Sequence, residues 1–226
     1  MNPDSALFQA STWVVPVIMA VTFHEASHGF VAYRFGDTTA WEAGRVTFNP
    51  LKHIDPFGTV VLPAMLFLTA GFLFGYAKPV PVDFRRLHNP RRDMVWVALA
   101  GPMTNVLLAI ASSLLLYAVE AMPVGTAALW LVANLENSIA INAVLCVFNM
   151  LPLPPLDGGR VAVGLLPLPL ARPLASLERY GMLIVLLLFV VSYAGRGSGL
   201  NILSWLVFIP AEALIDFVQT ITGQNG

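Results

Sequence analysis

The stretch Trp13-Val-Val-Pro-Val-Ile-Met-Ala-Val-Thr-Phe23 runs directly into His24-Glu-Ala-Ser-His28. Two histidines four residues apart on a helix are separated by about 400° of rotation, so both imidazoles project from nearly one face and can bind one metal ion. Glu25 lies about 100° from His24, where it can reach a water molecule on the metal without binding the metal itself. Zinc suits two imidazoles and a carboxylate and needs no redox chemistry, so the sequence predicts one zinc ion per chain, ahead of iron or manganese.

A His-Glu-x-x-His string can also arise by chance, and on a soluble surface helix it would carry less weight. The apolar run before the motif makes a chance match less plausible than a metal site. Three ionisable side chains at membrane depth are costly unless they are paired or bound to a metal. The setting therefore favours a metal site over coincidence.

The rest of the chain is equally apolar. Its 226 residues are 57% hydrophobic and only 11% charged, a composition typical of a multi-pass membrane protein. We expect an all-α membrane protein with about five to six apolar helices and short extended or β-like re-entrant segments near the active site. Apolar runs that approach or exceed the length needed to cross a bilayer lie at residues 12–34, 58–76, 94–120, 128–151, 178–194 and 200–221.

We expect one membrane-embedded domain over residues 1–226, with a catalytic core at about 12–162 and C-terminal helices at about 178–221. Residues 1–11 lack the basic region and cleavage site of a signal peptide, so the first helix is expected to stay. Pro16 is expected in the first turns of that helix, where its missing N–H costs least. The net charge of -1 and the lack of a basic run exclude nucleic-acid binding.

Two polar segments follow the motif. Residues 45–48 form a strand-like run bounded by Gly44, and residues 76–83 are expected to be extended because Pro79 and Pro81 exclude a helix. Extended backbone beside a metal site could hold a peptide by main-chain hydrogen bonds. Plain surface loops explain these segments equally well.

A second informative stretch is Phe148-Asn-Met-Leu-Pro-Leu-Pro-Pro-Leu-Asp-Gly-Gly-Arg160. Its prolines end a helix, and its paired glycines permit close backbone approach just beyond Asp157. A zinc site with two histidines needs one more protein ligand and an open position, and Asp157 is the best-placed acid. Asn149 could donate a hydrogen bond to a substrate carbonyl or its oxyanion.

Three other polar residues have open roles. Asn105, in Gly101-Pro-Met-Thr-Asn105, either faces the active site or belongs to a packing notch between helices. His53 and His88 lie in loops rich in proline and charge, where a solvated or interfacial histidine is favoured over a ligand.

Three motifs together resemble the site-2 protease family of zinc intramembrane metalloproteases: His24-Glu-x-x-His28, Gly101-Pro-x-x-Asn105 and Asn149-x-x-Pro-x-Pro-Pro-Leu-Asp157-Gly. Residues 49–56 and 75–82 resemble the compact prokaryotic branch of that family, without PDZ or CBS modules. The resemblance covers most of residues 12–162.

The resemblance implies that His24, His28 and Asp157 bind zinc and that Glu25 activates the attacking water. Asn149 would hold the substrate strand or the oxyanion, with Asn105 in support. It also implies regulated cleavage of membrane-spanning proteins or peptides within the lipid bilayer. A homo-oligomer stays open.

The motifs also constrain topology, because the chain must cross the bilayer an even number of times between His28 and Asp157, unless the proline-broken end around Pro152 returns Asp157 deep into the membrane. Both intervening basic loops, 34–57 and 77–93, would be cytoplasmic under the positive-inside rule. We therefore predict that residues 58–76 dip in and return, although a true span remains the alternative. The protein is then expected in the prokaryotic cytoplasmic membrane, with its N-terminus outside and its active site toward the cytoplasm.

The sequence thus predicts a zinc metalloendopeptidase that cleaves in or near transmembrane segments. The alternative from another class is a membrane metal-ion transporter or carrier that uses the same histidines and aspartate. A transporter predicts polar residues spread along several helices as a path, whereas here they concentrate at the motifs. Another intramembrane zinc hydrolase, such as a prenyl-protein protease, would not carry Leu156-Asp157-Gly158 at this position.

Overall fold

The structure, a computed structural model, describes residues 5–70, 75–195 and 201–224, and all of its described regular elements are helical. The longer helices are α1 (Ala6–Arg34), α4 (Pro90–Glu120), α5 (Thr126–Asn149), α8 (Glu178–Ala194) and α9 (Ile209–Thr222). The shorter elements are α2 (Thr39–Glu42), η1 (Pro50–Lys52), η2 (Pro56–Val61), α3 (Leu62–Ala70), η3 (Phe84–Arg86), α6 (Asp157–Leu165), α7 (Leu168–Ser176) and η5 (Ser204–Phe208).

Four helices in the described part of the chain are long and apolar enough to cross a membrane: α1, α4, α5 and the combined η5–α9 element. The pair α7 and α8, bent by 65°, would make a fifth. The protein is therefore an all-α, multi-pass membrane protein, as predicted. The apolar run 58–76 is not among the candidate spans, and its residues 71–74 lie outside the described residues.

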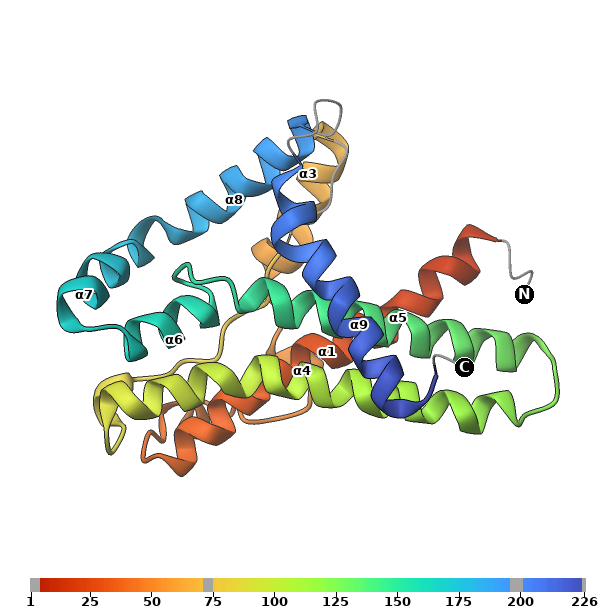
Figure 1. Cartoon of the computed structure of the whole chain (residues 1–226), viewed down its shortest axis with the longest axis horizontal. Coiled ribbons are helices and arrows are strands. Elements are labelled where there is room, and N and C mark those ends of the chain that lie inside the picture. The colour runs from red at the N-terminus through yellow and green to blue at the C-terminus, as the bar shows by residue number, and fades with distance from the viewer. Residues whose placement is uncertain (1–4, 71–74, 196–200, 225–226) are drawn as a thin grey trace.

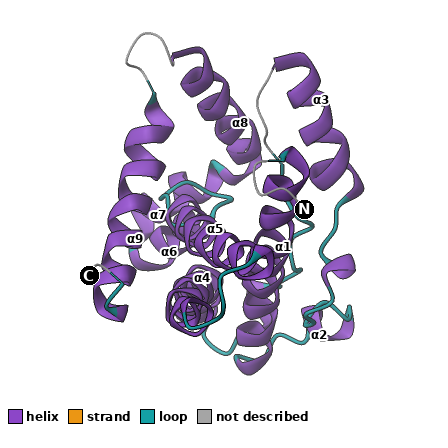
Figure 2. Ribbon diagram, turned by 90° about the vertical axis from the view of Figure 1, so that its right-hand side faces the viewer, coloured by secondary structure: helices purple, strands orange, loops and turns teal. Residues whose placement is uncertain are grey.

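The centre of the molecule is made by α1, α4 and α5, which pack side by side (Figures 1 and 2). Small residues of these helices, such as Ala20, Ala26 and Ala98, are almost fully buried. Small side chains let helix backbones approach closely, which is how helices associate where lipid removes the usual hydrophobic driving force. The three helices that carry His24, Asn105 and Asn149 therefore form one packed unit.

The expectation for Pro16 was wrong, because α1 begins at Ala6 and the proline lies well inside the helix. A proline in a helix leaves the carbonyl four residues earlier without its usual N–H partner. That carbonyl belongs to Thr12, and it accepts a hydrogen bond of 3.2 Å from Asn137 Nδ2 of α5. A neighbouring helix thus satisfies the group that the proline leaves free.

The segment between α1 and α4 is largely irregular near the site. No described residue is in a β-strand, so the strand-like run predicted for 45–48 is not a regular strand; these residues bend after Gly44, which has φ 62°. Instead of pairing by a backbone ladder, the Arg45 guanidinium donates to Lys78 O at 2.6 Å. Residues 76–83 are non-helical, as the prolines predicted.

The two ends of the 58–76 run meet. Tyr76 N donates to Gly58 O at 3.0 Å, and Thr59 Oγ1 donates to Tyr76 O at 3.0 Å. The chain therefore leaves and returns to one place. This closure is compatible with a segment that dips into the membrane, and the re-entrant topology stays a prediction.

Candidate metal centre

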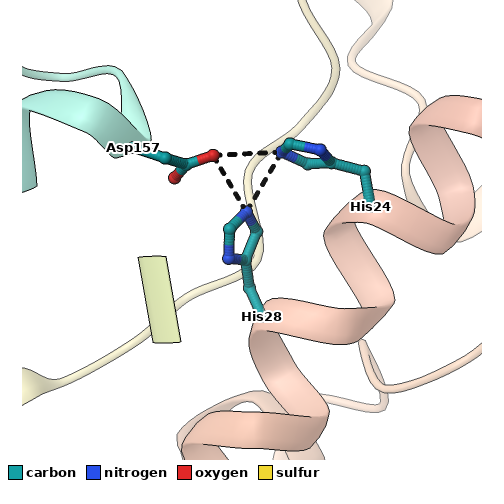
Figure 3. A group of neighbouring side chains, drawn as sticks. All are labelled: His24, His28 and Asp157. Atoms are coloured by element: carbon teal, nitrogen blue, oxygen red, sulfur yellow. Dashed lines mark hydrogen bonds and ion pairs between the residues drawn. The ribbon is translucent and has the colours of Figure 1, made fainter. Parts of the chain in front are cut away.

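Two helices bring the three predicted metal ligands together. α1 carries His24 and His28 one turn apart, and α6 begins at Asp157. The two imidazole Nε2 atoms are 3.1 Å apart, while Asp157 Oδ2 lies 3.2 Å from His24 Nε2 and 3.3 Å from His28 Nε2 (Figure 3). All three residues are buried. The three atoms form a small triangle beneath the protein surface.

The size of this triangle suits a tetrahedral metal ion. Zinc bonds to imidazole nitrogen and carboxylate oxygen are about 2.0–2.2 Å long, which places neighbouring ligand atoms of a tetrahedron about 3.3–3.6 Å apart. The observed separations lie at or just below the short end of that range. Within the described ranges, no second group of His, Cys, Asp and Glu side chains converges in this way.

The hydrogen bonds behind the imidazoles decide which ring nitrogen faces the cluster. His28 Nδ1 lies 2.7 Å from Val97 O, and His24 Nδ1 lies 2.6 Å from Asn105 Oδ1. Carbonyl oxygens only accept, so each neutral imidazole carries its proton on Nδ1 and keeps a lone pair on Nε2.

The aspartate adds a third electron pair, because Asp157 Oδ2 is buried and accepts no hydrogen bond from a described residue. Three electron-pair donors thus converge without a hydrogen-bond donor between them. These three ligand atoms fit a zinc ion. Each imidazole is oriented by a hydrogen bond from its other ring nitrogen, as is usual for histidines that bind a metal.

Close backbone approach puts these groups in reach of one another. A Cβ atom on Gly101 of α4 would lie 2.5 Å from His28 Nε2 and 2.6 Å from His24 Nε2, so only glycine leaves room for the imidazoles. A Cβ on Gly158 would lie 2.1 Å from Met150 O, which explains the tight turn that presents Asp157. The glycines of both motifs are therefore steric requirements of the cluster.

A cavity of about 350 Å³ opens in front of the three ligands. Glu25, Asn149, the segment 75–82 and Val185 of α8 contribute to its wall. One Glu25 oxygen, Oε2, accepts a hydrogen bond of 2.8 Å from Val80 N. Its other oxygen accepts none from a described residue, so Glu25 is held at the cavity with one oxygen available.

The two asparagines predicted for the site occupy different places. Asn149 lines the cavity, and its Nδ2 donates to Leu145 O at 2.9 Å on its own helix. Asn105 is fully buried and contacts His24 from behind rather than lining the cavity. Of the two readings left open for Asn105, the structure places it against a metal-ligand candidate.

The remaining histidines lie apart from the cluster. His88 is exposed, whereas His53 is only 3% exposed and its Nε2 bonds Thr47 O at 2.9 Å. His53 is therefore not solvated, because the irregular segment 75–83 folds over this loop: Lys78 N donates to His53 O at 2.9 Å. A place for His53 at the membrane interface stays a prediction.

Sequence reasoning missed two groups that contact site residues. Val80 binds Glu25 through its backbone N–H, a donor that every residue except proline carries, so no sequence signal marks it. Asn142 of α5 bonds Asn105 at 2.8 Å. Its signal was available, since a fully polar amide in an apolar run needs a partner.

Comparison with models of protein families assigns the chain to a family. Residues 12–131, just over half of the sequence, match the model of peptidase family M50. The chain belongs to peptidase family M50. Its resemblance to the site-2 proteases is thereby confirmed. No solved structure gives a significant match.

Relatives of this M50 chain come from bacteria and archaea. "Putative zinc metalloprotease YwhC" of Bacillus subtilis (strain 168) is 41% identical over 204 residues, which are 84% of this chain and 90% of that protein. "Putative zinc metalloprotease Rip2" of Mycolicibacterium smegmatis is 32% identical, over 79% of this chain and 66% of that protein. "Putative zinc metalloprotease MJ0611" of Methanocaldococcus jannaschii is 31% identical, over 62% of each. These names support a zinc-dependent protease role and agree with the donor set of the cluster.

Proposed function

We propose that this M50 protein is a zinc-dependent endopeptidase that hydrolyses peptide bonds in or near transmembrane segments of membrane-protein substrates. The observation that carries the proposal is the meeting of His24, His28 and Asp157 at a cavity wall inside a bundle of membrane-capable helices. A site at that place receives a substrate that is itself in the membrane. The names of the relatives supply the zinc protease chemistry.

Zinc bound by these three side chains would polarise the scissile carbonyl and lower the pKa of the attacking water. Glu25, with one oxygen free at the cavity, takes the proton of that water and later delivers it to the leaving amine. Val80 N–H holds the other oxygen and so limits the rotation of the carboxylate. Asn149, also in the wall, is placed to donate to the substrate carbonyl once its amide leaves Leu145 O.

The irregular segment 75–82 along the cavity is proposed to hold the substrate in extended form. A transmembrane helix must unwind before a peptide bond within it can be attacked, because its carbonyls and N–H groups are paired internally. Main-chain groups of this segment could replace some of those lost bonds. This proposal keeps the strand-edge role that the sequence suggested, without a regular strand.

The site is proposed to face the cytoplasm. Every Lys and Arg of the described residues lies in the segments 34–52, 78–92 or 160–179. Figure 1 places the end of α1, the start of α4, and α6 and α7 toward one end of the molecule. Positive charge gathered at one end of a helical bundle marks its cytoplasmic side. We extend this orientation to the cytoplasmic membrane of a prokaryotic cell.

The test is zinc content together with cleavage of a model transmembrane peptide by detergent-purified protein. We expect about one zinc per chain in wild type and in Glu25→Gln, and loss of zinc in Asp157→Ala. Cleavage should fall by about 10²–10⁴-fold in Glu25→Gln because the proton acceptor is gone. Glu136→Gln, an exposed acid on α5, is the matched control and should behave as wild type.

Each alternative has its own outcome. Zinc that survives Asp157→Ala would overturn the ligand assignment. Bound zinc without cleavage by wild type, combined with zinc uptake into vesicles that contain the protein, would favour a metal transporter over a protease.

A further inference from the structure

A line of buried polar groups leads away from the cluster between α4 and α5. His24 Nδ1 meets Asn105 Oδ1 at 2.6 Å, Asn105 Nδ2 donates to Asn142 Oδ1 at 2.8 Å, and Asn142 Nδ2 donates to Ser138 O at 2.8 Å. Asn105 is 0% exposed and Asn142 is 1% exposed. The line joins three helices, α1, α4 and α5, through side-chain amides.

Ser138, at the end of this line away from the metal site, determines which group donates and which accepts in every hydrogen bond of the line. Ser138 O is a backbone carbonyl and can only accept, so the Asn142 amide must turn its Nδ2 toward it and its Oδ1 toward Asn105. That oxygen in turn takes the Nδ2 of Asn105. The remaining Oδ1 of Asn105 then faces His24, whose Nδ1 must carry the proton.

A second acceptor, Ala20 O, favours the same orientation of the Asn105 amide. Asn105 Nδ2 also lies 3.3 Å from Ala20 O, a longer contact than the 2.8 Å bond to Asn142. The two N–H groups of this amide therefore have one acceptor each, and Asn142 provides the shorter bond. Removing Asn142 would leave one buried N–H without a partner and weaken the orientation of the amide.

The two histidines differ in how they are held. His28 Nδ1 bonds the backbone carbonyl of Val97, which cannot exchange its acceptor for a donor. His24 bonds a side-chain amide, which presents a donor instead of an acceptor if it turns by 180°. The ligand geometry of His24 thus depends on what fixes that amide.

We infer that Asn142 is a positioning residue for His24: acting through Asn105, it keeps the His24 proton on Nδ1 and the Nε2 lone pair directed at the metal site. The inference rests on the zinc site proposed above. Asn142 lies outside the three motifs of the sequence and does not line the cavity. Its role is to set the direction of hydrogen bonds two side chains away from the ligand atom.

A packing role for Asn142 is the competing explanation, because buried amides also hold membrane helices together. Only the positioning role predicts a change in the His24 tautomer. The tautomer is measured by ¹⁵N NMR of the metal-free, ¹⁵N-histidine-labelled full chain. An Asp157→Ala background removes the carboxylate that would otherwise draw a proton to Nε2, and His24→Gln in that background assigns the His24 signals.

We expect the Nδ1–H form of His24 in the background protein, and a mixture of Nδ1–H and Nε2–H forms after Asn142→Leu. Asn142→Asp should retain the Nδ1–H form, because either protonation state of aspartate offers an oxygen to Asn105 Nδ2. Asn142→Ala, which removes the acceptor without adding a branched side chain, repeats the test should leucine disturb folding. An unchanged tautomer in the leucine or alanine variant overturns the inference.

Zinc affinity, measured by chelator competition with Asp157 intact, gives a second readout. Loss of a partner behind a ligating histidine typically weakens metal binding by about 10–100-fold, and we expect the low end, about tenfold, for Asn142→Leu. Asn134→Leu is the matched control: this α5 asparagine is 7% exposed and bonds Trp130 O at 2.8 Å, apart from the line to His24. It should bind zinc as wild type does.

The two proposals fail in different ways. Wild-type protein that binds no zinc would refute the metalloprotease role, while the tautomer result would still decide the role of Asn142. Equal zinc affinity and an unchanged tautomer in Asn142→Leu would leave the protease intact and reduce Asn142 to packing.

Discussion

The unit of α1, α4 and α5 and the C-terminal pair α8 and α9 are held together in different ways. The first unit buries polar side chains that contact one another's helices, among them Thr12, His24, His28, Asn105, Ser112 and Asn142. Among the described residues of α8, η5 and α9, Ser192 is the one buried polar side chain. Apolar side chains such as Leu183, Leu187 and Phe217 are exposed there, where lipid would cover them.

This difference separates two tasks of the molecule. Hydrogen bonds fix the direction of each group, so a helix in the first unit cannot rotate or slide without breaking several of them. The last turn of α9 is joined to α4 by a hydrogen bond between Ser113 Oγ and Thr222 Oγ1 at 2.7 Å. Apolar contacts along α8 constrain position less strictly, because the tails of lipids replace them at little cost. α8 nevertheless contributes Met182 and Val185 to the cavity wall. We therefore expect the metal centre to be rigid and the α8 wall to tolerate change.

The largest effect is expected from one methyl group in the first unit, Gly101→Ala. The new Cβ would lie 2.5 Å from His28 Nε2, so the imidazoles must move away from each other or from Asp157. A displacement of about 1 Å at a reacting centre can lower the rate by about 100-fold, and we expect at least that loss of cleavage together with weakened zinc binding.

Gly125→Ala at the start of α5 is the matched control, since the nearest heavy atom to its Cβ, Pro123 O, is 3.9 Å away. Zinc content by atomic absorption and peptide cleavage are the measurements. Normal zinc and cleavage in Gly101→Ala would show that the cluster is far less rigid than its packing indicates.

An intermediate effect on cleavage is expected from a change at Val80, where the irregular segment 75–83 contacts Glu25 of α1. Val80→Pro removes the N–H that Glu25 Oε2 accepts, and hydrogen bonds to charged groups contribute roughly 1.5–3 kcal/mol. We expect the cleavage rate to fall by about tenfold while zinc content stays at the wild-type level. Val80→Ala keeps the N–H and shortens only the side chain, so steady-state rates of the two variants separate the hydrogen bond from packing. Equal rates in both variants would mean that the hydrogen bond from Val80 N–H to Glu25 does not contribute to the rate.

The sequence predicted correctly those features that follow from the type and spacing of a few residues. The apolar runs located α1, α4, α5, α8 and α9, and the spacing of His24 and His28 predicted a shared face on a helix that the structure contains. Asp157 was placed by elimination among the acids, and it meets both imidazoles. These features are local, or depend on chemistry that few residues can supply.

The relations between helices were harder to predict. Which face of α4 turns toward α1 decides whether Asn105 lines the cavity or supports His24, and a rotation of one helix by a single residue changes the answer. The burial of His53 depends on the return of a distant segment, 75–83, over its loop. Both outcomes arise from packing between elements that are far apart in sequence.

The smallest effect on activity is expected in the C-terminal pair, from Ser192→Ala. Ser192 Oγ donates to Asn201 Oδ1 at 2.6 Å and accepts from Leu203 N at 2.9 Å, so it ties α8 to the residues before η5. Loss of a buried hydrogen-bonding group costs about 1–3 kcal/mol, and each kcal/mol lowers the melting temperature by about 2–4 °C in a chain of this size. Zinc content and cleavage at 25 °C should stay at wild-type levels, because none of these atoms reaches the metal centre.

Thermal unfolding in detergent measures the expected fall in melting temperature. Ser176→Ala is the control, because Ser176 is an exposed serine of α7 that bonds Pro173 O. A lower melting temperature with unchanged zinc and cleavage would confirm that stability in the C-terminal pair is separable from the chemistry of the first unit. Loss of zinc in Ser192→Ala would instead show that α8 and the metal centre form one cooperative structure. In that case α8 would be part of the rigid unit, and substrate entry would have to occur elsewhere around the cavity.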